Sequence, residues 1–275
     1  GRKYNNPGDA RIKNLIIQYF QLLDAFIGAI FPSSDSENNL LVVSDHGFGP
    51  LTGQFNINNW LEQQNLLFYN QTKRKNLRLK MNVQKIRSLA RKADVLNLRH
   101  IILRRAAGNA GRMRAYAFLD CIDWSRTKAY SVSSTEQGVY INLKHRQSEG
   151  IINPGREYES LRNSVIAKMR DLRDPLTGEP LVSEIYRKEE IYKGRYLDDA
   201  PDIVFILKNG QYAASVQPKK TLFDRATLKT GTGTHRPDGV FLAAGGSFGR
   251  KGRPEPFGIA CVAPTILYLL GVSVP

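Results

Sequence analysis

The stretch from Leu40 to Pro50, LLVVSDHGFGP, most constrains the fold of this chain. Its apolar run, Leu40 to Val43, is typical of a buried parallel strand. Asp45 and His46 follow at the carboxyl end, where open α/β sheets bind their ligands. A carboxylate beside an imidazole suits Zn²⁺ or Mn²⁺, and Gly47 lets the backbone turn so that both side chains can face one ion. Taken alone, the pair also fits a helix cap beside a surface imidazole.

Helical and extended patterns alternate along the rest of the chain. Apolar spacing predicts helices over residues 12–31, 58–67, 157–172 and 263–270, with Asn58 or Asn59 as the cap of the second. Runs of β-forming residues predict strands over 127–132, 138–143 and 200–207, and through GVFLAAGG near the end. The alternation predicts an α/β fold with a mostly parallel sheet flanked by helices.

The charge of the chain is concentrated in one segment. Its 275 residues carry a formal net charge of +15, and residues 71–115 hold fourteen Lys or Arg against the single acid Asp94. Apolar residues recur at helical spacing between these cations, which predicts a basic helical insertion. The basicity is therefore local to this insertion and is not the signature of a chain that binds nucleic acid throughout.

Cysteine usage and the termini bear on the cellular location. Cys121 and Cys261 lie far apart without C-x-x-C spacing, which excludes a disulfide framework and a cysteine zinc ribbon and favours a reducing compartment. No apolar run is long enough for a membrane span, and no signal segment opens the sequence. The missing initiator Met and the abrupt ends indicate a fragment. A cytoplasmic location is the expectation, and a signal peptide upstream of residue 1 is the alternative that stays open.

A second candidate ligand is His235, in the polar loop TGTGTHRPDG before the strand GVFLAAGG. A solvated turn residue is the alternative interpretation. Both motifs border predicted strands, so a parallel sheet is expected to bring them together. The loop matches neither a P-loop nor the dinucleotide fingerprint, because Arg236 replaces the third glycine, and no G-x-S-x-G elbow occurs. Five aspartates are interpreted as cap or turn residues: Asp24, Asp123, Asp199, Asp202 and Asp224. His100 and His145 lie among cations and are interpreted as structural or surface residues.

Four segments in this order, SDHGFGP, FNINNWLEQQNLL, GTHRPDGVFLAAGGSF and VAPTILYLLGVSVP, resemble the alkaline phosphatase superfamily. The likeness is to its type I phosphodiesterase and nucleotide pyrophosphatase branch and to related predicted phosphohydrolase/phosphomutase proteins. It implies an alkaline-phosphatase-like fold, with the second half of the metallohydrolase core in residues 1–70, the basic insertion in 71–115, an α/β cap with core strands in 116–230, and a C-terminal core segment in 231–275.

The resemblance also implies a two-metal phosphoryl-transfer site. Asp45 and His46 are expected to ligate one divalent ion and His235 the other, with Zn²⁺ or Mn²⁺ as the metals. Family members use a Thr or Ser nucleophile, which is expected upstream of residue 1, so the catalytic nucleophile is unknown and this chain alone is expected to be inactive. The expected substrate is a small phosphate ester.

Two alternatives stay open. One is a cofactor-independent phosphomutase of the same superfamily, which would isomerise a phosphate ester instead of releasing a product of hydrolysis. The other is a non-catalytic module whose insertion, residues 71–115, binds nucleic acid or an anionic membrane. A solvated amphipathic cap over the site is favoured over that module, because apolar residues for packing interrupt the cations. The sequence predicts no oligomeric state.

Overall fold

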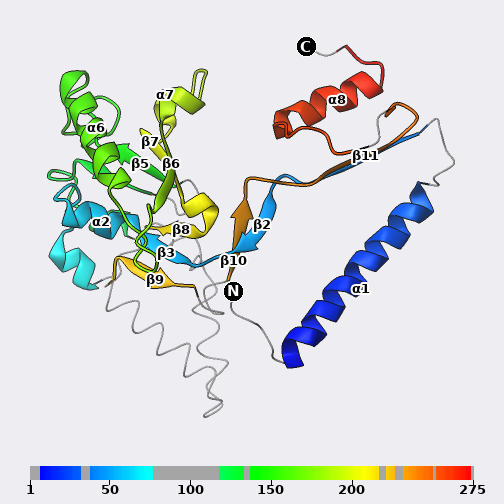
Figure 1. Ribbon diagram of the computed structural model, residues 1–275. Helices are drawn as coiled ribbons and strands as arrows, with labels where there is room; N and C mark the ends of the chain where they lie inside the picture. The colour runs from blue at the N-terminus through cyan, green and yellow to red at the C-terminus, as the bar shows by residue number, and fades with distance from the viewer. Residues whose placement is uncertain are drawn as a thin grey trace, which may run out of the picture. The chain divides into compact units, whose positions relative to one another are not determined.

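The computed structural model describes residues 7–31, 38–76, 118–132, 137–216, 221–226, 232–249 and 252–273 (Figure 1). The chain divides into two compact units. Unit 1 comprises Gly1–Gly47 and Pro237–Pro275, and unit 2 comprises Phe48–Arg236.

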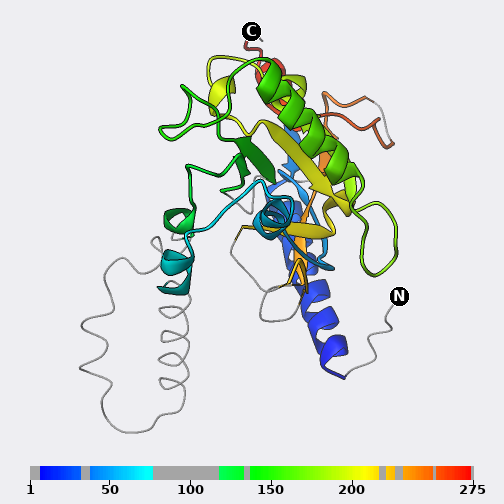
Figure 2. The ribbon, with the colours of Figure 1, turned by 90° about the vertical axis from the view of Figure 1, so that its left-hand side faces the viewer.

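The larger sheet of unit 2 has four strands in the order β4 (Ala129–Tyr130), β5 (Gly138–Ile141), β7 (Ile203–Leu207) and β6 (Val182–Arg187). All its neighbouring strands are antiparallel. Helix α6 (Arg156–Arg170) runs beside this sheet (Figure 2) and buries Val165 and Met169 completely. The apolar positions of this helix recur every three to four residues, so one stripe faces the core.

The second sheet of unit 2 has three strands in the order β8 (Tyr212–Ser215), β3 (Gly53–Asn56) and β9 (Phe223–Arg225). Strand β3 is parallel to β8 and antiparallel to β9. Helix α2 (Ile57–Gln63) follows β3 directly, and its Trp60 and Leu61 join Phe55 and Phe205 in one buried core that links both sheets. Most of the hydrophobic stabilisation of unit 2 comes from this core.

Unit 2 also contains several short elements. Strand β2 (Gly47–Pro50) pairs with β10 (Gly233–Arg236). Further short elements are η1 (Leu119–Cys121), α7 (Lys188–Ile191), η2 (Leu197–Asp199) and η3 (Lys208–Gly210). The turn DPLTG follows α6 and is stabilised by Asp174. This carboxylate accepts hydrogen bonds from the N–H of Leu176 and the hydroxyl of Tyr212, both at 2.9 Å. It also forms an ion pair with Lys208.

Unit 1 contains α1 (Pro7–Ile30), β1 (Asn39–Val43), β11 (Phe241–Gly245), η4 (Ile259–Cys261) and α8 (Val262–Leu269). Strands β1 and β11 are antiparallel, with Val43 opposite Phe241 and Asn39 opposite Gly245. Among the residues of unit 1 whose burial is described, none is fully buried. Within the part of the chain that the structure describes, no helix is long and apolar enough to cross a membrane.

The mixed α/β content agrees with the sequence-based expectation, but the prediction of a mostly parallel sheet was wrong. Among the described strand pairs of known direction, only β3 and β8 run parallel. The strand at Leu40 is half-buried and pairs antiparallel with β11. An apolar run predicts that a strand is covered, but its direction relative to a partner depends on residues about two hundred positions away. The four expected domain ranges stay a prediction.

Candidate functional site

Asp45 and His46 lie directly after β1 in unit 1, in the bend that the sequence predicts. The Oδ2 atom of Asp45 is 3.4 Å from Nε2 of His46, so both side chains turn to the same side of the chain. The aspartate side chain is 80% exposed and the imidazole 39% exposed. Both side chains are therefore at least partly accessible to solvent.

The imidazole of His46 is oriented by its own backbone. Its Nδ1 atom lies 2.8 Å from the carbonyl oxygen of Gly47. A carbonyl can only accept, so Nδ1 carries a proton and donates it to this carbonyl. Ligating histidines commonly donate one ring N–H to a carbonyl in this way, which fixes the tautomer and the ring orientation. The local geometry therefore fits a metal ligand.

His235 lies in unit 2, on strand β10 and not in the loop that the sequence predicts. The reason is its pairing with β2, a contact between residues about 185 positions apart. The imidazole is exposed, and the ring of Phe48 on β2 meets it edge to face at a centroid distance of 6.3 Å. Gly233 makes room for Phe48, because a Cβ there would lie 2.3 Å from the phenyl ring.

The segment that follows His235 connects with the Asp45 motif inside unit 1. The N–H of Val240 donates to Oγ of Ser44 at 2.7 Å, and the N–H of Ser44 donates to the carbonyl of Val240 at 3.0 Å. A side chain at Gly239 would lie 2.8 Å from the same Oγ. The end of β1 thus meets the start of β11, which antiparallel pairing allows and the expected parallel pairing does not.

No group of three or more His, Cys, Asp or Glu side chains among the described residues is arranged to hold a metal ion. The structure pairs Asp45 with His46 and places His235 in the other unit. Of the other two histidines, His145 is exposed in a turn and His100 lies outside the described residues.

The basic insertion, residues 71–115, falls mostly outside the described residues, so its proposed partners stay predictions. Its described start is docked on α2. Arg74 is buried and makes two hydrogen bonds to the carboxylate of Glu62, at 2.5 and 2.9 Å. The guanidinium also lies 4.3 Å from the ring centre of Tyr69. At least this cation is therefore a packing residue and not part of an exposed basic patch.

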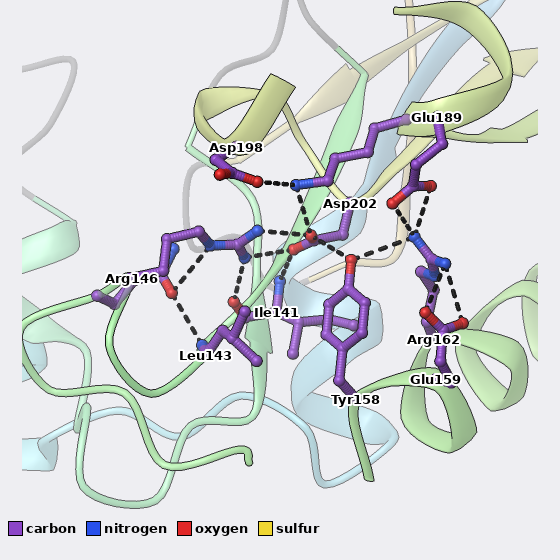
Figure 3. A network of polar contacts seen from close by, with 11 residues as sticks. Ile141, Leu143, Arg146, Tyr158, Glu159, Arg162, Glu189, Asp198 and Asp202 are labelled. Atoms are coloured by element: carbon purple, nitrogen blue, oxygen red, sulfur yellow. Dashed lines mark hydrogen bonds and ion pairs between the residues drawn. The ribbon is translucent and has the colours of Figure 1, made fainter. Parts of the chain in front are cut away.

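Sequence reasoning missed a buried polar network around Asp202 (Figure 3). Asp202 is fully buried before β7, and each of its carboxylate oxygens accepts two hydrogen bonds. Arg146 donates to both oxygens at 2.7 and 2.6 Å, Tyr158 donates its hydroxyl proton to Oδ1 at 2.7 Å, and Ile141 its N–H to Oδ2 at 2.7 Å. The expected cap or turn role was wrong, because these donors come from distant positions.

The network extends to the surface through Arg162. Its guanidinium pairs with Glu189 and Glu159 and donates to the hydroxyl of Tyr158 at 3.1 Å. Burial alone raises the pKa of Asp202, but the hydrogen bonds from Arg146, Ile141 and Tyr158 more than offset it and hold the pKa below its usual value. The carboxylate is saturated by donors, so we assign it a structural role that joins α6, β5 and β7.

The family model described as type I phosphodiesterase / nucleotide pyrophosphatase matches residues 4–238. The chain belongs to this family. It is thereby placed in the alkaline phosphatase superfamily, as the resemblance implied. Comparison with curated proteins gave no match, and comparison with solved structures gave none. The match includes Asp45, His46, His235 and the Asp202 network.

Membership of the type I phosphodiesterase family supports a phosphoester hydrolase at the family level. Members generally use divalent metals, and small phosphate esters are the substrate class that the family implies. The exposed pair Asp45 and His46 offers one oxygen and one nitrogen donor for such an ion.

Proposed function

We propose that this type I phosphodiesterase family member hydrolyses phosphodiester or pyrophosphate bonds of small phosphate esters with two divalent metal ions. In this proposal Asp45 and His46 hold one ion and His235 contributes to the other. The observation that carries it is the paired orientation of Asp45 and His46 within a chain of this family. None of the three is proposed as the nucleophile, whose identity stays unknown.

The separation of the two donor atoms is compatible with zinc at the first position. Ligand atoms about 2.0–2.2 Å from a tetrahedral zinc ion lie about 3.3–3.6 Å from each other. Oδ2 of Asp45 and Nε2 of His46 are 3.4 Å apart. When bound, divalent ions supply charge for the phosphoryl oxygens and lower the pKa of a bound hydroxyl or water. His46 holds its proton on Nδ1, and so presents Nε2 as the ligand atom.

Replacement of single ligands in the full-length protein tests this function. We expect His46→Ala and His235→Ala each to lower the hydrolysis of bis(p-nitrophenyl) phosphate and of a dinucleoside pyrophosphate by about 100-fold or more. The physical reason is that each metal ion stabilises the transition state by several kcal/mol, and each 1.4 kcal/mol is a factor of ten. Chelation with EDTA should have the same effect, and added Zn²⁺ or Mn²⁺ should reverse it.

His145→Ala is the matched control, because it removes an exposed imidazole in a turn of unit 2. Its activity should stay at the level of the unchanged protein. Full activity of His46→Ala or His235→Ala would refute the ligand assignment. Isomerisation of an added phosphomonoester, without hydrolysis of bis(p-nitrophenyl) phosphate or the dinucleoside pyrophosphate, would instead establish the phosphomutase alternative.

A further inference from the structure

We propose that Arg236 is a positioning residue that holds strand β10 in register and thereby keeps the imidazole of His235 on the exposed face of the strand. The inference rests on the proposed function, since it treats His235 as a metal ligand. The inference adds Arg236, which supplies no ligand atom to the metal and acts through its neighbour His235.

The guanidinium of Arg236 joins three segments that are far apart in the sequence. Nη2 donates a hydrogen bond to the carbonyl of Pro50, the last residue of β2. Nη1 donates to the carbonyl of Gly210, the last residue of η3, and also contacts the carbonyl of His235 at 3.2 Å. A planar guanidinium can make such a fork with two carbonyls at once, and the single ammonium of lysine cannot reproduce its geometry.

Two glycines leave the space in which this guanidinium lies. A Cβ at Gly49 would be 2.6 Å from Nε of Arg236, and a Cβ at Gly210 would be 2.9 Å from Nη1. Gly210 also has a φ of +78°, which favours glycine. The backbone of β2 and η3 is thus fitted closely around one side chain, as expected for an anchor.

The position of Arg236 determines the face on which His235 lies. Side chains of successive strand residues point to opposite faces, and Arg236 points toward η3 while His235 is exposed. A slip of one residue between β2 and β10 would exchange the two faces. A two-stranded ladder is only marginally stable by itself, so its register depends on further contacts. The hydrogen bond from Arg236 to Gly210 connects the β2–β10 pair to η3. Because η3 directly follows β7, the pair is also connected to the four-stranded sheet.

The histidine resonances provide a test that does not depend on turnover. The chain has four histidines, so selective ¹³C labelling of the imidazoles gives few signals, and His235→Gln and His46→Gln assign the two that matter. Titration with Zn²⁺ alone should shift the His235 signal of the unchanged protein. In Arg236→Lys and in Gly49→Ala, which displaces the guanidinium without removing it, the zinc concentration for half-shift should rise about 10- to 100-fold.

Two controls separate positioning from a loss of folding. Arg225→Met removes an exposed arginine at the end of β9 and should leave the His235 titration unchanged. The His46 signal, from the other unit, should titrate equally in the unchanged protein, Arg236→Lys and Gly49→Ala. Equal weakening at His46 and His235, or an unchanged His235 titration in both Arg236→Lys and Gly49→Ala, would overturn the positioning role. No response of His235 to Zn²⁺ in the unchanged protein would instead refute its role as a ligand, and with it the proposed function.

Discussion

Asp202 illustrates, at the scale of single residues, how a buried carboxylate is kept ionised by its neighbours. Its side chain is inaccessible to water, and Arg146 supplies a bidentate counter-charge while Ile141 and Tyr158 complete the four hydrogen bonds. Removing one partner of such a buried pair usually costs about 3–5 kcal/mol, because the other charge stays buried without compensation.

We therefore expect Asp202→Asn to lower the free energy of unfolding by about 3–5 kcal/mol at neutral pH. The pKa of Asp202 in the folded protein is lowered, so its ionisation stabilises the fold above its ordinary pKa of about 4. That stabilisation is lost as the pH falls through the lowered folded pKa. Denaturant unfolding between pH 2 and pH 7 should thus show a smaller pH dependence for the variant.

The matched control is Asp171→Asn, which changes an exposed aspartate at the end of α6. Its unfolding curve should differ from that of the unchanged protein by less than about 0.5 kcal/mol. An Asp202→Asn variant as stable as this control would show that the network of Figure 3 contributes little to stability.

At the scale of elements, α2 differs from its expected boundaries in an informative way. The helix begins at Ile57, so Asn58 and Asn59 lie inside its first turn and are buried. Asn58 donates to the carbonyls of Ser131 and Val216 at 2.9 and 3.1 Å and accepts from the N–H of Ser131 at 2.9 Å. The amide thus satisfies backbone groups from two distant segments and does not cap its own helix.

Asn58→Ala should destabilise unit 2 by about 2–4 kcal/mol, because it leaves one buried N–H and two buried carbonyls without this partner. Urea unfolding followed by tryptophan fluorescence measures the loss, since Trp60 is in the same helix. Gln63→Ala, at an exposed position of α2, serves as control and should change stability by less than about 0.5 kcal/mol. Equal stabilities of the two variants would contradict the bridging role of Asn58.

At the scale of the whole molecule, burial is distributed unequally. The buried hydrophobic residues of the described chain all lie between Phe55 and Val216, within unit 2. In unit 1, α1 exposes ten large apolar side chains, and β1 and β11 form a two-stranded sheet. Local stability follows buried apolar contacts, so the two units should differ in their opening free energies.

Amide hydrogen exchange should therefore be at least about 100-fold slower in β7 than in β1 and β11. Mass spectrometry of deuterated peptides measures both regions in the same sample. Added Zn²⁺ should slow exchange around residues 40–46 if Asp45 and His46 bind it, because a ligand stabilises the state to which it binds. Equal protection of β1 and β7 without metal would contradict the unequal distribution of burial.

The sequence by itself determined the local features of this protein. The helices over residues 12–31, 157–172 and 263–270 and the strand at 200–207 were predicted within a few residues, because side-chain periodicity is a local property. The pairing of Asp45 with His46 also follows from neighbouring positions and a glycine. The sequence motifs were sufficient to identify the family, and the match over residues 4–238 confirmed it.

Only the tertiary structure decided which distant segments meet. It set the antiparallel pairing of β1 with β11, placed His235 on a strand, and surrounded Asp202 and Arg236 with partners from remote positions. No local pattern marks these roles, since Arg146 and Tyr158 lie 56 and 44 positions from Asp202, and Gly210 and Pro50 lie 26 and 186 positions from Arg236. Such contacts form because buried polar groups must find hydrogen-bond partners wherever packing of the apolar core places them.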